Sequence, residues 1–482
     1  MRNDAEAGTV ALDDGQRRWT YAELDKEEAR LAGRLQAQGT RVFATLLDNS
    51  PAWVIADLAA TRAGVVHVPL PVFFSPEQIS HALGAAGVDT LLALPAIAAR
   101  WPQAPTSECT IAGQPLSMLR LSAAAPPMPE RTAKITFTSG TTGAPKGVCL
   151  DAEAMREVAR GLVQAMEPLD IRRHLCALPF AVLLENIAGL MAPLLRGATC
   201  LTLPVQKLGL SGSSSFDAAR FHAVVMAQRP HSIILLPQML RIWTGYLAQS
   251  SQRAPDSLKL VAVGGAAVGV KLILAARALG IPAYEGYGLS EGASVQTLNL
   301  PGADRPGSAG RALPHARLRL AADGEVEVGG ALFGGYLGDP IAPPPSWWPT
   351  GDLGEIDADG FLHIRGRKKN LLITGFGRNV SPEWVETALR SEDTVAQAVV
   401  FGDGQPALSA VLWPVRPDAD DAELQAAVDA ANATLPDYAR VSRWARARAD
   451  FNSESGLATA NGRPQRAAIL QRHMDALGFP AT

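Results

Sequence analysis

The chain has 482 residues, of which 47% are hydrophobic and 19% are charged, a balance typical of globular rather than disordered proteins. Its 44 Lys and Arg residues and 47 Asp and Glu residues give a formal net charge of -3. No run rich in lysine or arginine interrupts that balance, so the sequence predicts no surface for nucleic acids or anionic membranes. A chain of this length is expected to fold into two or more domains.

The sequence shows no signal for export or for a membrane span. Its acidic start lacks the apolar core of a secretory signal, and Arg62 and Arg196 interrupt the most apolar stretches within membrane-spanning length. The cysteines are scattered singly, with the spacing of neither a disulfide framework nor a zinc site. We therefore expect a reducing compartment, the cytoplasm. The cysteines are Cys109, Cys149, Cys176 and Cys200.

The first third of the chain alternates helix and strand signals. Thr20 and Glu23 form a capping-box pair before a helix with one apolar stripe. Residues 42–47 are predicted to be a buried strand, and Ser50-Pro51 is expected to begin a helix that runs to Ala60. Residues 65–68 form another predicted strand. This alternation indicates a largely parallel sheet covered by helices on both faces. The apolar stripe consists of Leu24, Leu31 and Leu35.

Composition breaks divide the remainder of the chain. Residues 123–130 are predicted to be a surface connection, residues 211–215 a flexible loop and residues 343–345 a further break. From about residue 370 the pattern changes to short strands with helices between them, which predicts a smaller α+β domain. The expected strands there are Leu371–Thr374, Val395–Phe401 and Leu408–Trp413.

A glycine- and hydroxyl-rich segment, Thr138–Gly147, follows the strand-like residues 134–137. Glycines let the backbone approach a polyanion, while hydroxyls, exposed N–H groups and Lys146 can bind phosphate oxygens. The Gly-Lys-Ser/Thr spacing of the Walker loop is absent. A flexible linker is the alternative, but a linker does not require Pro-Lys-Gly at a fixed place after a strand. The predicted phosphate-binding residues are Thr138, Ser139, Gly140, Thr141, Thr142, Gly143 and Lys146.

Further motifs follow in an order that resembles the adenylate-forming (AMP-binding) superfamily. That superfamily includes acyl-CoA synthetases, firefly-type luciferases and peptide-synthetase adenylation domains, and the resemblance is closest to acyl-CoA synthetases and acyl-carrier-protein ligases. It covers nearly the whole chain. Besides the phosphate loop, the matching segments are Tyr284–Glu291, Thr350–Asp352, Gly366-Arg367, Gly377 and Asn461-Gly462.

The resemblance implies an α/β fold with two lobes. Residues 1–368 would form a large ATP- and acyl-binding lobe of parallel sheets covered by helices, with a small β-barrel-like part. Residues 369–482 would form a small, mobile α+β lobe. The family's hinge residue maps to Lys369, although an exposed linker lysine would look the same in sequence.

The resemblance also implies roles in nucleotide binding. Tyr287 would stack on adenine, and Ser290, where the family usually has threonine, would contact the α-phosphate. Glu291 would hold Mg²⁺, a hard cation that prefers oxygen ligands. Asp352 would accept both ribose hydroxyls, and Arg367 would contact the ribose. The alternatives are a core aromatic at Tyr287 and a turn residue at Asp352. Three further family positions near the nucleotide are Glu285, Gly286 and Gly288.

One position departs from the family pattern. The family usually places a catalytic lysine after the glycine of the last motif, where this chain has Arg463. No lysine occurs after Lys369, so Arg463 is expected to bridge the substrate carboxylate and ATP. The catalytic residues would then be Arg463, Lys146, Ser290 and Glu291. Decay of the motif, leaving a protein that binds only nucleotide, is the alternative.

The acid and the acceptor are less visible in the sequence. The small-residue turn at Gly264, Gly265 and Ala266 would wall the acyl pocket by the family pattern. Residues 178–184, where amino-acid-activating relatives place an aspartate, contain no acidic residue before Glu185. A buried ammonium would lack a partner, which favours an apolar fatty or aryl acid. We expect ATP and Mg²⁺ as cofactors, and coenzyme A or an acyl-carrier-protein phosphopantetheine as the thiol acceptor. A ligase that stops at acyl-AMP or uses another acceptor is a rival hypothesis.

Overall fold

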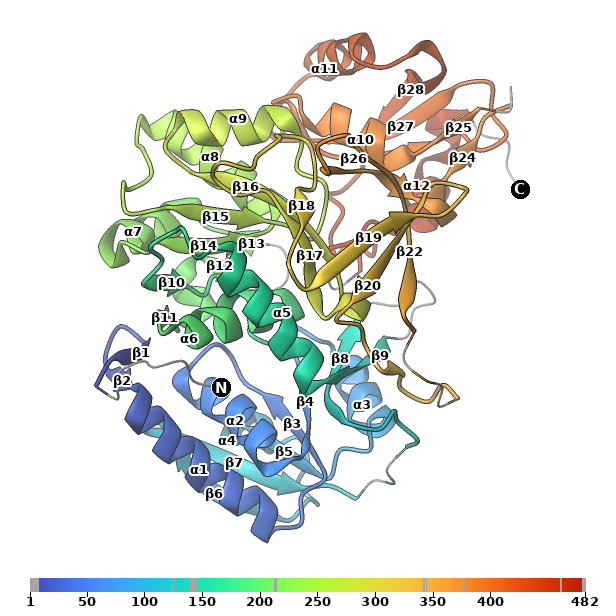
Figure 1. The fold of residues 1–482 in the computed structure, drawn as a ribbon. Coiled ribbons are helices and arrows are strands. Elements are labelled where there is room, and N and C mark those ends of the chain that lie inside the picture. The colour runs from blue at the N-terminus through green and yellow to red at the C-terminus, as the bar shows by residue number, and fades with distance from the viewer. Residues whose placement is uncertain are drawn as a thin grey trace.

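The computed structural model describes residues 8–122, 124, 126–138, 145–211, 215–340, 343, 345–375, 378–459 and 462–478. Two mixed sheets with their helices fill the lower and middle parts of Figure 1, and a smaller lobe coloured orange to red lies at the top right. Of the helices in these residues, none is long and apolar enough to cross a membrane.

The first sheet has the strand order β21-β9-β8-β4-β3-β5-β7-β6. Its central strands β8, β4, β3 and β5 run parallel, and antiparallel strands flank them on both sides. This arrangement brings β21, from far along the chain, to the edge beside β9. The strands are β3 Val42–Leu46, β4 Val66–Pro69, β5 Thr90–Ala93, β6 Thr106–Ile111, β7 Gln114–Arg120, β8 Thr132–Thr138, β9 Lys146–Asp151 and β21 Gly335–Tyr336.

Two helices of this part begin where the sequence predicts. Helix α1 (Tyr21–Ala37) carries the complete capping box of Thr20 and Glu23, and its leucine stripe is buried. Helix α2 (Pro51–Ala63) starts on the Ser50 hydroxyl, which accepts the Trp53 amide, and runs three residues beyond the expected end. The helices α3 Pro76–Ala85 and α4 Pro95–Ala98 complete the set.

The second sheet has the order β18-β17-β16-β15-β14-β10-β11-β1-β2, with parallel pairing from β16 to β1. Its strands are β1 Val10–Asp13, β2 Arg18–Thr20, β10 Arg173–Leu175, β11 Thr199–Leu201, β14 Ser232–Leu235, β15 Leu260–Val263, β16 Ala283–Leu289, β17 Ser294–Leu298 and β18 Arg311–Ala312. Its helical segments are α5 Ala152–Ala165, η1 Glu185–Met191, α6 Ala192–Arg196, η2 Val205–Leu208, α7 Ala218–Gln228, α8 Pro237–Ser250, α9 Val270–Ala278 and η3 Ser290–Gly292.

The sequence predicts a flexible loop at residues 211–215, but the structure has strand residues at both of its ends. Ser211 in β12 (Leu210–Ser211) pairs with Ser215 in β13 (Ser215–Phe216), so backbone hydrogen bonding orders both flanks. Residues 212–214 lie outside the described residues. At the other predicted breaks, the described residues of 123–130 and 343–345 belong to no helix or strand.

A separate antiparallel sheet, ordered β19-β20-β22-β23, takes the place of the expected small β part and leads into the smaller lobe. Its strands are β19 Ala316–Leu320, β20 Glu325–Gly330, β22 Trp347–Ile356 and β23 Leu362–Arg367. The smaller lobe is α+β, and its elements are η4 Lys368–Asn370, β24 Leu372–Ile373, β25 Asn379–Val380, α10 Pro382–Arg390, β26 Val395–Phe401, β27 Leu408–Pro414, α11 Asp421–Ala433, η5 Asp437–Ala439, β28 Val441–Arg446 and α12 Arg466–Leu477. An ion pair of 2.5 Å between Lys271 Nζ on α9 and Glu392 Oε1 joins the two lobes.

Candidate active site

The predicted phosphate loop joins β8 to β9. Thr138 and Lys146 are register partners at the end of the β8–β9 pair that the loop connects. The Thr138 hydroxyl donates a 3.5 Å hydrogen bond to the Lys146 carbonyl. The strands therefore fix both ends of the loop. Residues 139–144 lie outside the described residues, and they include Ser139, Gly140, Thr141, Thr142 and Gly143.

Tyr336 lies between the phosphate loop and the second motif. Its hydroxyl donates a 2.7 Å hydrogen bond to Oε1 of Glu291, and Lys146 Nζ lies 5.3 Å from the centroid of its ring. Tyr336 reaches this place because β21 pairs with β9, opposite Val148. Burial, and then the Glu291 carboxylate, raise the pKa of Tyr336, so the phenol stays a donor. Tyr336 belongs to none of the sequence motifs and was not among the predicted site residues.

The second motif combines β16 with a tight turn. Beyond its parallel pairing with β15, β16 pairs antiparallel with β17. A Cβ added to Gly288 would lie 1.8 Å from the Ser294 carbonyl oxygen, so the close approach of these strands requires glycine. Ala293 and Ser294 have φ angles of 52° and 107°, in the region that favours glycine. This turn places Ser290 and Glu291 just beyond the end of the strand.

The third motif supplies a buried carboxylate with two protein partners. Tyr287 Oη donates a 2.6 Å hydrogen bond to Asp352 Oδ2, and Arg367 Nε lies 2.9 Å from Asp352 Oδ1. Asp352 and Arg367 are register partners of β22 and β23. Burial raises the pKa of Asp352, whereas Arg367 and Tyr287 act in the opposite direction. Each carboxylate oxygen keeps acceptor capacity beyond its one protein bond.

The structure places Glu285 at the base of the second motif. Its Oε2 accepts a 2.6 Å hydrogen bond from the Gly307 amide. Burial raises the pKa of Glu285 to about 7, while the backbone amides of Gly307 and Gly269 act against that rise. Glu285 therefore holds two loops next to β16.

Gly264, Gly265 and Ala266 follow β15, as the sequence predicts. A Cβ added to Gly264 would lie 3.4 Å from the Gly286 carbonyl oxygen, and Gly265 has a φ of 89°. The turn therefore approaches the second motif closely.

Arg463 of the smaller lobe lies in the electrostatic field of the nucleotide motifs. The surrounding protein displaces water from Arg463 and lowers its pKa, and the charge of Arg367 lowers it further. The carboxylates of Asp352 and Glu291 act on it in the opposite direction. Its side chain keeps access to solvent. Its backbone is held by Thr459, whose amide donates to the Arg463 carbonyl at 2.8 Å and whose hydroxyl accepts the Arg463 amide at 3.2 Å.

Lys369 lies in η4, directly after β23, and is exposed. Partial loss of water around its ammonium, and then the charges of Arg367 and Arg463, lower the pKa of Lys369. The segment that links the lobes thus lies close to the cationic side of the site. Gly377 and Asn461, two further motif residues, lie outside the described residues.

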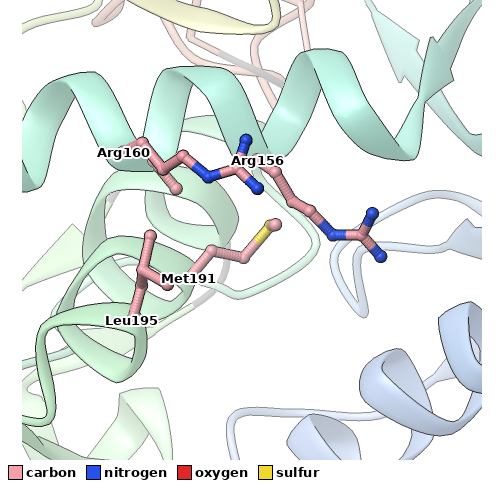
Figure 2. Close-up of a pocket in the computed structure, with 5 residues that line it drawn as sticks. Arg156, Arg160, Met191 and Leu195 are labelled. Carbon is pink, nitrogen blue, oxygen red and sulfur yellow. The ribbon is translucent and has the colours of Figure 1, made fainter. Parts of the chain in front are cut away.

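A surface pocket lies elsewhere, between α5 and the η1–α6 segment (Figure 2). Its lining residues are Arg156, Ala159, Arg160, Met191 and Leu195, and none of them belongs to the motifs.

Two family models cover most of the chain. The model of AMP-binding enzymes matches residues 2–336, and the model of the C-terminal domain of AMP-binding enzymes matches residues 369–477. The chain belongs to the AMP-binding enzyme family. The family resemblance predicted from the motifs is confirmed.

Curated relatives of this AMP-binding enzyme are similar over most of their length. A long-chain-fatty-acid–CoA ligase of Mycobacterium bovis is 27% identical, over 87% of this chain and 84% of the relative. A 2-succinylbenzoate–CoA ligase of a Geobacillus species is 28% identical, over 82% and 81%. A feruloyl-CoA synthase of an Amycolatopsis species is 29% identical, over 80% and 81%.

Solved structures share the fold of the AMP-binding enzyme. The o-succinylbenzoate CoA synthetase of Bacillus subtilis in complex with an acyl-adenylate has a TM-score of 0.77 at 24% identity, covering 96% of this chain and 95% of that one. An anthranilate CoA ligase in complex with anthranoyl-AMP has a TM-score of 0.78 at 20% identity, covering 98% and 94%. The predicted two-lobed α/β fold is confirmed.

Proposed function

We propose that this enzyme activates an apolar carboxylic acid with ATP and Mg²⁺ and transfers the acyl group to the thiol of coenzyme A. The observation that carries the proposal is the convergence of charged groups from separate motifs. Lys146 lies over the ring of Tyr336, the Tyr336 hydroxyl donates to Glu291, and Arg463 interacts electrostatically with Asp352 and Glu291. The curated relatives named above carry acid–CoA ligase names, which supports the same reaction.

In the first half-reaction a carboxylate oxygen of the acid attacks the α-phosphorus of ATP. The bond from that phosphorus to its bridging oxygen breaks, which gives acyl-AMP and pyrophosphate. In the second half-reaction the thiol sulfur attacks the acyl carbonyl carbon and expels AMP, while the thiol proton leaves to solvent. The protein supplies positioning and charge stabilisation in both steps.

The proposed nucleotide roles follow the geometry of the motifs. Tyr287 would stack on adenine with its ring orientation fixed by the hydrogen bond to Asp352. Asp352 would accept the ribose hydroxyls with its remaining acceptor capacity, and the charge of Arg367 opposes the rise that burial causes in the pKa of that carboxyl. Ser290 would donate to the α-phosphate.

Glu291 offers the oxygen ligand that a magnesium ion prefers, and it is partly accessible to solvent. When bound, Mg²⁺ neutralises phosphate charge. Lys146, over the ring of Tyr336, would add a positive charge against the phosphates.

Arg463 is the proposed bridge between the acid's carboxylate and the α-phosphate. Its guanidinium can bind two oxygens at once, which a lysine cannot do with fixed geometry. We propose a lobe boundary between residues 368 and 369, with Lys369 as the hinge about which the smaller lobe would turn between the half-reactions. The position of Lys369 directly after β23 supports this proposal.

The proposed acyl pocket lies between two core clusters. Leu184, Ala188 and Ala262 are partly buried and pack against both clusters. The small-residue turn at Gly264, Gly265 and Ala266 would form another wall. Apolar side chains of this kind favour a fatty or an aryl acid over a charged substrate.

Coenzyme A is the acceptor that we favour over an acyl carrier protein. Either acceptor would need basic residues, and three arginines of the smaller lobe are engaged within that lobe. Arg440 donates to the Leu435 carbonyl, Arg443 donates to the Leu477 carbonyl, and Arg446 pairs with Asp421. A basic docking face for a carrier protein is therefore less supported.

The cytoplasmic location is likewise our proposal, supported by four free cysteines.

The experiment is a two-stage assay of the purified protein. Pyrophosphate release is measured with ATP, Mg²⁺ and single fatty, aryl and amino acids, and AMP release is then measured with coenzyme A or a phosphopantetheinylated carrier protein. We expect release with apolar acids and a thioester with coenzyme A. If no acid causes pyrophosphate release, the protein only binds nucleotide. If acyl-AMP forms but neither thiol consumes it, the protein is a ligase that stops at acyl-AMP or uses another acceptor.

A further inference from the structure

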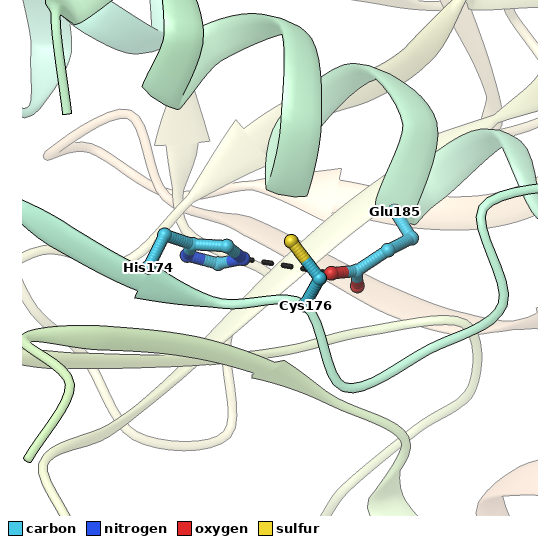
Figure 3. A group of neighbouring side chains, drawn as sticks. All are labelled: His174, Cys176 and Glu185. Carbon is cyan, nitrogen blue, oxygen red and sulfur yellow. Dashed lines mark ion pairs between the residues drawn. The ribbon is translucent and has the colours of Figure 1, made fainter. Parts of the chain in front are cut away.

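A group of buried polar side chains lies between β10 and η1, outside the nucleotide motifs (Figure 3). His174 and Cys176 are two residues apart on an extended segment, so their side chains share one face. Glu185, the first residue of η1, faces them. One ligand atom from each of the three residues lies within 4.8 Å of the others, and His174 Nε2 is 3.5 Å from Glu185 Oε1.

The Cys176 thiol donates to the Gly189 carbonyl at 3.4 Å, but His174 and Glu185 make fewer hydrogen bonds than their burial would normally require. Among the described residues, His174 Nε2 and both carboxylate oxygens of Glu185 make no hydrogen bond, although His174 is 2% exposed and Glu185 is 0% exposed. Buried polar groups are normally satisfied, and an unpaired buried carboxylate is costly. This combination points to a ligand that the three residues share.

His174 is oriented in the way that metal-binding histidines usually are. Its Nδ1 lies 2.8 Å from the Ser232 hydroxyl of the neighbouring strand β14. With Nδ1 as the donor of that hydrogen bond, Nε2 presents its lone pair toward Glu185 and Cys176. Such a second partner fixes the tautomer and the ring plane of a ligating imidazole.

Gly189 keeps space open beside these atoms. A Cβ added there would lie 2.4 Å from Glu185 Oε1 and 3.0 Å from His174 Nε2. Gly189 belongs to η1, a π-helical segment of the kind often found at functional sites. The widened helix and the missing side chain together leave the three ligand atoms facing one another.

We propose that His174, Cys176 and Glu185 bind a zinc ion, which fixes β10 to η1. An imidazole nitrogen, a thiolate and a carboxylate are all ligands that zinc accepts, and together they would neutralise its charge. On binding, the Cys176 S–H proton leaves to solvent and a zinc–sulfur bond forms. Because η1 also carries Ala188, the ion would stiffen one wall of the proposed acyl pocket.

The alternative to a bound metal is that Glu185 and Cys176 keep their protons. Burial raises the pKa of Glu185, and burial with the nearby Cys200 thiol raises that of Cys176 well above its usual range. A neutral acid beside a neutral thiol is therefore the competing state, and the two states differ in cobalt binding.

The test uses the full-length protein, stripped with a chelator under reducing conditions and titrated with Co²⁺ in excess Mg²⁺ without ATP. We expect one Co²⁺ per chain, with a thiolate-to-cobalt charge-transfer band that Zn²⁺ abolishes. Cys176→Ser should lose the band, whereas Cys149→Ser, which changes another buried free cysteine, should keep it. Ser232→Ala should keep the band and weaken Co²⁺ binding by about tenfold or more.

Two outcomes would overturn the proposal. One is wild-type protein that develops no thiolate band at saturating Co²⁺. The other is a band that persists in Cys176→Ser. If Cys176→Ser does not fold, Ser232→Ala decides, since unchanged Co²⁺ affinity in that variant contradicts the site.

Discussion

The hydroxyl of Tyr336 donates a 2.7 Å hydrogen bond to Oε1 of Glu291, although the two residues are 45 positions apart. The same ring has Lys146 Nζ at 5.3 Å from its centroid. One side chain therefore orients both the carboxylate proposed to hold Mg²⁺ and the lysine proposed to contact phosphate.

Tyr336→Phe should weaken Mg²⁺ binding while keeping the aromatic ring beside Lys146. A hydrogen bond to a charged group contributes about 1.5–3 kcal/mol, so we expect about tenfold or more Mg²⁺ to be needed for half-maximal pyrophosphate release. Tyr438→Phe, an exposed tyrosine in η5, is the control. Equal Mg²⁺ titrations for wild type and Tyr336→Phe would show that this hydrogen bond has no role.

Asp352→Asn should raise the KM for ATP by about tenfold or more, because it weakens the Arg367 pair and the proposed ribose contact. Asp357→Asn is the matched control. Asp357 is also an aspartate paired with an arginine, but its partner is Arg305, whereas Asp352 pairs with Arg367. Steady-state kinetics at saturating acid measure both variants. A KM for ATP that rises equally in both would assign the effect to the sheet rather than to the nucleotide.

Glu285→Gln should change the pH dependence of stability. Burial raises the pKa of Glu285 from 4.5 to about 7, so the folded protein binds this proton more tightly than the unfolded chain. The stabilisation is complete below the unfolded pKa and is lost as the pH rises through the folded one, with a total of up to about 3 kcal/mol.

Asp304 acts to raise this pKa and Arg277 to lower it, so both must stay unchanged in the comparison. Relative to wild type, Glu285→Gln should therefore be more stable at about pH 8 than at about pH 5. Thermal unfolding midpoints measure the difference. A constant offset between the proteins over this range would contradict the raised pKa.

Arg463→Ala should separate the two half-reactions. Pyrophosphate release should fall by about a hundredfold or more, the loss typical of removing one group that stabilises developing charge. Thioester formation from synthetic acyl-AMP should change little, since the proposed bridge between the acid and ATP acts only in the adenylation step. Arg463→Lys should recover part of the adenylation rate. Unchanged pyrophosphate release in Arg463→Ala would make the assignment wrong.

Local interactions were predictable from the sequence. The capping box of Thr20 and Glu23 and the Ser50-Pro51 helix start depend on atoms within four residues of one another, so composition and spacing determine them. Tyr287, Asp352 and Arg367 were also predicted, because each belongs to a family motif, and the structure brings these three together.

Contacts between distant segments were not predictable in this way. Tyr336 reaches Glu291 only because β21 joins the edge of the first sheet beside β9. Cys176, considered singly, has no zinc spacing, but the fold brings it to His174 and Glu185. Such approaches depend on strand order and helix packing, which residue spacing does not encode.

In the proposed reaction the carboxylate of the acid attacks the α-phosphorus of ATP, and the resulting acyl-AMP is the precursor of the thioester. Carboxyl-¹⁸O-labelled acid, incubated with the enzyme, ATP, Mg²⁺ and coenzyme A, tests it directly by mass spectrometry of the products. If the carboxylate attacks as proposed, AMP carries one ¹⁸O atom and pyrophosphate carries none. Unlabelled AMP, or label in phosphate or pyrophosphate, would contradict it.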